Sequence, residues 1–163
     1  LFFTLAGLAG LSNLLQSNIT DYYKTLHLYF ISKAKGAEFT TSEQVIQKHQ
    51  QTKRGIAKAL FFLYRWYSML QITVTPQLQN LLHRLHIRYG EDFPENIRLQ
   101  LRQKSKALMP QIDRMTFNDR SVVLFLSVLS GFVWIYFIYE IVVLNCVLVS
   151  NIRRHEQMCK NFI

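Results

Sequence analysis

The hydrophobic positions of this chain fall into two long blocks at either end of a region with helical polar and apolar stripes. Residues 1–15 are apolar and uncharged, and residues 121–149 contain a single charged residue, Glu140. Residues 18–120 carry eight acidic and sixteen basic side chains. Since about 20 apolar residues are needed to cross the hydrocarbon core of a bilayer, this segregation predicts an integral membrane protein.

The central region has the three- and four-residue spacing of amphipathic helices and no strand-like alternation. Stripes recur at Tyr22, Leu26 and Phe30, at Leu78, Leu81, Leu82 and Leu85, and at Ile97, Leu101 and Leu108. Local signals suggest where these helices begin and end. The Thr40–Glu43 capping box opens a helix running to about Val74, Thr75 caps a helix beginning at Pro76, Gly90 ends it, and Pro94 and Pro110 bound the next. We therefore predict an all-α fold.

Four segments follow from the pattern. Residues 1–17 are expected to be the trailing part of a truncated transmembrane helix, residues 18–120 a basic, helical, membrane-proximal region, residues 121–149 a transmembrane helix, and residues 150–163 a short basic tail. The chain would thus have one or two transmembrane helices. A straight helix over 121–149 would be about 44 Å long, against a hydrocarbon core of about 30 Å. We expect one end to project, or a bend, for which Gly131 is the candidate.

The residue that stands out in the second apolar block is Glu140, because an ionised carboxylate at bilayer depth is costly. Three explanations remain open: it marks the far membrane interface, it faces a partner helix or polar cavity together with Asn145 and Tyr136, or it lines an ion or proton path. In the first block, Ala6 and Gly10 form a small-xxx-small pair that allows close helix packing.

An aromatic-basic run lies in the second half of the helix expected to end at Val74. Its members, Phe61, Phe62, Tyr64, Arg65, Trp66 and Tyr67, suit the headgroup level of a membrane, where Trp and Tyr are enriched. A helix that spans the membrane, and burial of the aromatic rings in a protein core, are the alternatives. We predict a membrane-interface helix.

The net charge of +9 indicates a negatively charged partner, either anionic lipid or nucleic acid. No dense Lys/Arg cluster or nucleic-acid-binding motif occurs, so anionic lipid headgroups are the expected counterions and nucleic acid is not an expected partner. Cys146 and Cys159 do not form a disulfide framework. General composition favours an internal eukaryotic membrane, either the endoplasmic reticulum or nuclear envelope, with the mitochondrial inner membrane as the alternative.

Catalytic and cofactor motifs are missing from the sequence: it contains no P-loop, GxSxG, GxGxxG or HExxH. We therefore expect no enzyme activity, cofactor or metal. The leading hypothesis is a non-catalytic subunit or scaffold of an integral membrane protein complex, with other membrane subunits as partners. The alternatives are a membrane-shaping or tethering protein that uses the aromatic-basic helix, and a homo-oligomeric channel or transporter protomer.

Overall fold

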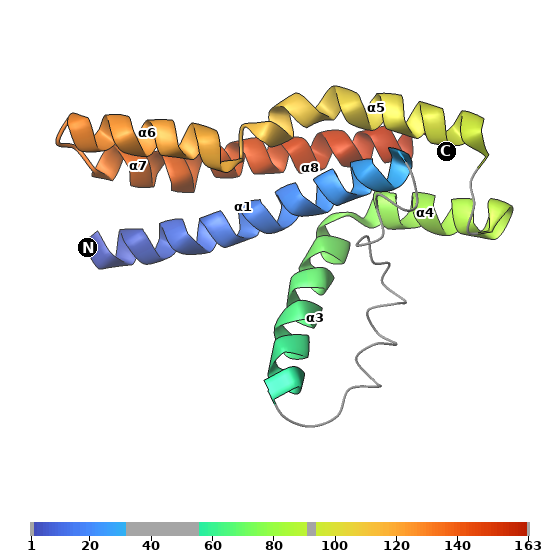
Figure 1. Cartoon of the computed structure of the whole chain (residues 1–163), viewed down its shortest axis with the longest axis horizontal. Helices are drawn as coiled ribbons and strands as arrows, with labels where there is room; N and C mark the ends of the chain where they lie inside the picture. Colours follow the sequence, from blue (N-terminus) through green and yellow to red (C-terminus); the bar gives the residue numbers. More distant parts are fainter. Residues whose placement is uncertain (1, 32–55, 91–93, 163) are drawn as a thin grey trace.

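The structure is a computed structural model that describes residues 2–31, 56–90 and 94–162, and all the regular elements in these ranges are helical (Figure 1). The prediction of an all-α fold is confirmed for this part of the chain. The expected capping box at Thr40–Glu43 lies outside the described residues. The elements are α1 (Phe2–Ile31), α3 (Ile56–Val74), α4 (Pro76–Tyr89), α5 (Glu95–Asp113), α6 (Phe117–Leu129), α7 (Trp134–Ile138), the π-helical turn η1 (Tyr139–Val143) and α8 (Leu144–Lys160).

Helix α1 joins the first apolar block and the amphipathic stripe that follows it into one helix of 30 residues. It lies alongside α5 and α8, while α4 packs against α8 and α3 projects to one side of the bundle (Figure 1). The hydrophobic core lies between α1, α4, α5 and α8, at the end of the bundle that carries most of the charges. Tyr23, Leu26, Leu78 and Leu101 are completely buried there. The predicted leucine stripe of α4 is therefore a core-facing stripe.

The start of α4 is stabilised by a residue distant in sequence. Pro76 occupies the first turn as predicted, but Thr75 does not cap the helix, because its hydroxyl donates to the carbonyl of Gln71 at 2.7 Å. The carboxylate of Glu156, on α8, instead accepts hydrogen bonds from the backbone N–H groups of Gln77 (2.7 Å) and Leu78 (3.2 Å). A negative group at a helix N-terminus is favourable. Glu156 therefore docks α4 onto α8.

The predicted helix end at Pro110 is wrong, because α5 continues through this residue to Asp113. Proline inside a helix removes one backbone hydrogen bond and crowds the preceding turn, which is costly. The residues just beyond it, Ile112 and Met115, are almost completely buried in the core. Burial of these two side chains offsets the local cost.

The apolar segment 121–149 reverses direction instead of forming a single helix. Helix α6 ends at Leu129, and the backbone turns at Gly131, whose φ is +77°. The N–H of Phe132 then donates to the carbonyl of Ser127 at 3.1 Å, and α7 runs back along α6 (Figure 1). The break lies at the residue expected to allow a bend, but it is a full reversal. The sequence-based expectation of one helix over 121–149 is therefore corrected to a helical hairpin.

After the turn, α7, η1 and α8 follow one another without interruption from Trp134 to Lys160. Within the described ranges, this is the one helix that is both long enough and apolar enough to cross a membrane.

Replacing Gly131 should weaken the hairpin. An added Cβ at this position would meet no atom within 4 Å, so steric contact is not the issue. The positive φ of Gly131 is instead unfavourable for alanine, because residues with a Cβ adopt this conformation at a cost of about 1–2 kcal/mol, whereas glycine does so freely. We expect Gly131→Ala to lower the free energy of unfolding by about 1 kcal/mol. Helical Gly10, which is also open to a Cβ, gives the matched control: Gly10→Ala should leave stability equal or higher in the same detergent unfolding titration.

Candidate functional site

The end of the molecule formed by the first half of α1, α6, the turn and α7–η1 exposes apolar side chains on all three helices. The exposed set comprises Phe2, Phe3, Leu8, Leu11 and Leu14 on α1, Val122, Leu124, Phe125, Leu126, Val128 and Leu129 on α6, and Phe132, Trp134, Ile135, Ile138, Val142, Val143 and Val149 beyond the turn. Soluble monomers rarely expose a contiguous apolar surface of this kind. We call this part of the molecule the apolar end.

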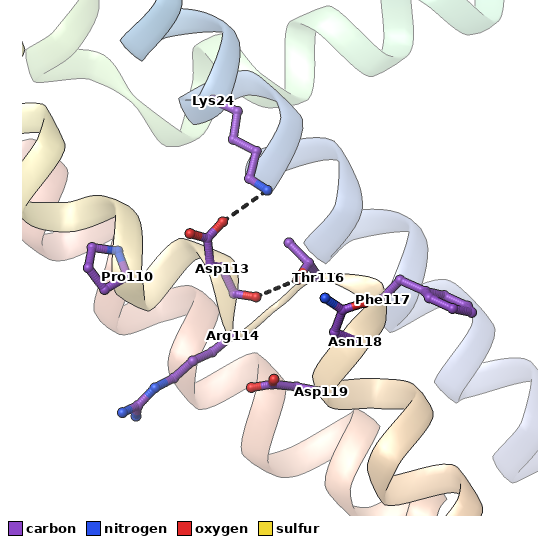
Figure 2. Close-up of a pocket in the computed structure, with 8 residues that line it drawn as sticks. All are labelled: Lys24, Pro110, Asp113, Arg114, Thr116, Phe117, Asn118 and Asp119. Carbon is purple, nitrogen blue, oxygen red and sulfur yellow. Dashed lines mark hydrogen bonds and ion pairs between the residues drawn. The ribbon is translucent and has the colours of Figure 1, made fainter.

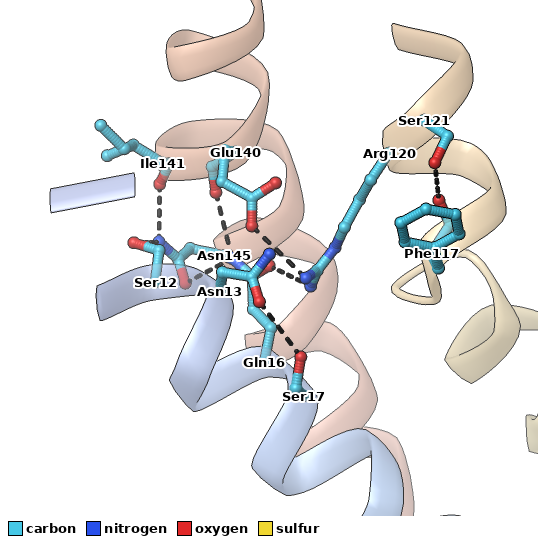
Figure 3. A network of polar contacts seen from close by, with 10 residues as sticks. All are labelled: Ser12, Asn13, Gln16, Ser17, Phe117, Arg120, Ser121, Glu140, Ile141 and Asn145. Atoms are coloured by element: carbon cyan, nitrogen blue, oxygen red, sulfur yellow. Dashed lines mark hydrogen bonds and ion pairs between the residues drawn. The ribbon is translucent and has the colours of Figure 1, made fainter. Parts of the chain in front are cut away.

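Polar side chains face one another inside the apolar end (Figure 3). The guanidinium of Arg120, at the start of α6, lies 3.7 Å from a carboxylate oxygen of Glu140 in η1. The exposed fraction of the side chain is 8% for Arg120 and 1% for Glu140. Charged groups in an apolar environment are stable only when they are paired. The buried charges of Arg120 and Glu140 therefore compensate each other within the chain.

Gln16 of α1 connects this ion pair to the rest of the network. Its side-chain oxygen accepts a hydrogen bond from Arg120 at 2.7 Å. Its amide group donates to the backbone carbonyl of Glu140 (3.0 Å) and to the side chain of Asn145 (3.1 Å). Gln16 is completely buried. A single side chain thus holds α1, α6 and the π-helical turn together (Figure 3).

Asn145 extends the network to the next turn of α1. Its amide group donates to the hydroxyl of Ser12 at 2.9 Å and to the carbonyl of Ile141 at 2.7 Å. The carbonyls of Glu140 and Ile141 both belong to η1, where the regular bonding of an α-helix is interrupted. Side-chain amides from Gln16 and Asn145 therefore satisfy acceptors that the irregular turn offers.

The structure brings together most of the polar residues that the sequence singled out. Glu140 and Asn145 both belong to the network, and Tyr136 lies half-buried one turn before Glu140. The contacts of Glu140 come from this chain, whereas the sequence had offered the membrane interface, a partner helix or cavity, or an ion path. The small-residue pair is placed differently: Ala6 is half-buried and Gly10 is exposed, while Ala9 makes the buried contact. Of the predicted pair, Gly10 is therefore not used for packing within the described chain, whereas Ala6 is partly covered.

Arg120 and Gln16 were missed by sequence reasoning. Arg120 was only one of the sixteen basic side chains of residues 18–120, and Gln16 lay at the edge of the first apolar block without a recognisable role. A signal for Arg120 does exist. Arg120 and Glu140 lie at equal distances in sequence from residue 130, so a hairpin reversing there must bring them side by side. The expectation of a single helix over 121–149 placed Arg120 and Glu140 far apart instead.

The predicted interface residues lie on α3, which leaves the bundle beside the middle of α1 (Figure 1). Phe62, Tyr64, Arg65 and Trp66 are exposed and Tyr67 is half-buried, while the side chain of Phe61 lies outside the described residues. The helix is fixed by Asn18, which donates to the carbonyl of Tyr67 at 3.2 Å and accepts from the side chain of Gln71 at 2.6 Å. The aromatic rings of α3 that the structure describes therefore do not fill a protein core.

A polar hollow of about 590 Å³ opens at the joint between α5 and α6, where charged residues resume beside the apolar end (Figure 2). Lys24 and Asp113 form an ion pair across it at 3.0 Å. Its lining residues are Lys24, Pro110, Asp113, Arg114, Thr116, Phe117, Asn118 and Asp119. The lining has no net charge, because one lysine and one arginine balance two aspartates. The hollow marks the border between the apolar end and the charged end.

Titratable groups of the charged end are shifted toward their neutral forms. Burial raises the pKa of Tyr22 to about 12, although hydrogen bonds with Thr75 and Gln79 oppose this shift. Burial, together with the nearby Arg102 and Lys106, lowers the pKa of His27, whose ring lies 2.7 Å from the hydroxyl of Ser105. These shifts have structural causes, and no group of three potential metal-binding side chains occurs among the described residues.

Comparisons with protein-family models, with curated proteins and with solved structures found no match to this chain.

Proposed function

We propose that the chain is a non-catalytic, membrane-embedded subunit or scaffold of a membrane protein complex. The observation that carries this proposal is the inverted polarity of the apolar end, where Arg120, Glu140 and Gln16 point inward and apolar side chains point outward. This arrangement suits surroundings of lipid tails or apolar helices.

The remainder of the bundle has the polarity of a protein in water. Its core is apolar, and its exposed charged side chains include Arg84, Arg88, Arg102, Lys104, Lys106, Arg153, Arg154 and Lys160. A scaffold with one end in the membrane and one basic end outside it can hold partners on both sides of the interface. Exposed Gly10 offers a small-residue face to a partner helix within the membrane.

The alternative of a homo-oligomeric channel depended on Glu140 lining a polar path. Its almost complete burial against Arg120 offers that alternative no support.

The test is affinity purification of the full chain from its native membrane in mild detergent, starting with the internal eukaryotic membranes that the composition favours. The mass and the composition of the purified particle are then measured. We expect other membrane proteins in fixed stoichiometry with the chain. A particle that contains only this chain and lipid would contradict the assignment as a complex subunit.

A further inference from the structure

Helix α3 joins α1 at the level where the exposed surface of the bundle changes character. On α1, Leu14 is exposed and apolar, whereas Asp21 is exposed and charged. Asn18, which holds α3 through the carbonyl of Tyr67 and the side chain of Gln71, lies between them. The same change occurs on α8 between Val149 and Arg153. The attachment point of α3 therefore coincides with the border of the apolar end.

The direction of α3 is also relevant. Helices α1, α5 and α8 run along the length of the bundle, and α3 projects sideways from it (Figure 1). If the bundle enters the membrane with its apolar end, a helix that leaves sideways at Asn18 runs along the membrane surface. About 24 Å of helix rise separate Asn18 from Phe2, which approaches the roughly 30 Å of the hydrocarbon core.

The side chains of α3 match the chemistry of the lipid headgroup layer. Phe62, Trp66 and Met69 recur at spacings of four and three residues, and their exposed fractions are 64%, 57% and 41%. The helix contains Lys58 and Arg65 and no acidic residue. Aromatic rings with basic groups favour the boundary between anionic headgroups and acyl chains.

From these observations we infer that α3 is a surface-lying helix that binds the anionic headgroup layer of the membrane and sets the depth to which the apolar end enters. The inference rests on the proposed membrane embedding of that end. The exposed face of α3 is proposed to contact lipid, because its attachment level, its basic charge and its exposed aromatic stripe all match the headgroup layer.

The two tryptophans of the chain allow both claims to be tested separately. Trp66 lies on α3, and Trp134 lies at the hairpin end, where ring contact between Phe2 and Phe137 at 5.3 Å holds α7 beside the start of α1. The full chain is reconstituted into phosphatidylcholine vesicles with about one third phosphatidylglycerol. The lipids carry bromine either near the headgroup or deep in the acyl chain. Trp134→Phe leaves Trp66 as the reporter, and Trp66→Phe leaves Trp134 as the matched control.

We expect the fluorescence of Trp66 to be quenched about twofold more by shallow than by deep bromine. Two results would overturn the inference for α3: quenching of Trp66 chiefly by deep bromine, or shielding of Trp66 from lipid bromine altogether. In the latter case, quenching by aqueous iodide would place α3 in water, and protection from iodide would place it under protein. Quenching of Trp134 by lipid bromine tests the membrane embedding independently, so failure of one claim is distinguishable from failure of the other.

Discussion

Removing either charge of the buried pair should destabilise the protein strongly, while removing both should not. Arg120→Leu leaves Glu140 as an uncompensated buried carboxylate, and Glu140→Leu leaves the guanidinium in the same position. We expect each single substitution to lower the free energy of unfolding by about 3–5 kcal/mol, and the double substitution to recover most of this loss. The measurement is unfolding in mixed detergent micelles by titration with a denaturing detergent, followed by circular dichroism.

Asp119→Asn provides the matched control for this double-mutant cycle, because Asp119 is adjacent to Arg120 but exposed. Its effect should stay within about 0.5 kcal/mol. Single substitutions of Arg120 and Glu140 that cost no more than the control would show that the pair does not hold the hairpin in place.

The second large effect is expected at Gln16. Substitution by leucine keeps the approximate volume of the side chain but removes its bonds to Arg120, Asn145 and the Glu140 carbonyl. Buried polar groups without partners cost about 1–3 kcal/mol each, so we expect a total loss of about 3 kcal/mol of stability. The same unfolding titration measures it.

Ser17→Ala is the control for Gln16→Leu, since the Ser17 hydroxyl donates only within α1, to Asn13 at 3.3 Å. The network also predicts non-additivity. The stability lost in the double variant Gln16→Leu/Arg120→Leu should be less than the sum of the two single losses, because both substitutions remove the same hydrogen bond. Strict additivity would contradict the network.

Local patterns in the sequence predicted much of the charged end. The leucine stripe from Leu78 to Leu85 identified the buried face of α4, and Gly90 and Pro94 marked helix ends correctly, because these signals depend on neighbouring residues alone. The cap of α4 was not predictable in this way. Glu156 reaches the helix from the far end of the chain, and only the packing of α8 against α4 brings it there.

The polar network forms only if the chain reverses at Gly131, and the sequence leaves this reversal ambiguous. Glycine is common inside membrane helices, so Gly131 predicted a bend no more strongly than continuation. Once the chain reverses there, Arg120 and Glu140 become neighbours, and the carboxylate gains a charged partner from its own chain. The identities of Glu140 and Asn145 as unusual polar residues could therefore be found from sequence, but their partners could not.

The proposed function requires the apolar end to lie in lipid, and the native Cys146 reports on this directly. Cys146 is exposed on α8 between Val142 and Val149, whereas Cys159 is buried. The purified chain is placed in lipid nanodiscs, which leave both membrane faces accessible, and its thiols are labelled with a polar maleimide. Arg154→Cys, introduced into a chain carrying Cys146→Ser, gives the comparison at an exposed position of the charged end.

Because the reactive thiolate and the polar reagent both avoid hydrocarbon, we predict that Cys146 in nanodiscs is labelled at least about tenfold more slowly than the introduced thiol of the Arg154→Cys variant. The difference should disappear once a denaturing detergent removes the lipid. Labelling of Cys146 in nanodiscs as fast as that of the Arg154→Cys variant would place the apolar end in water and contradict the central claim.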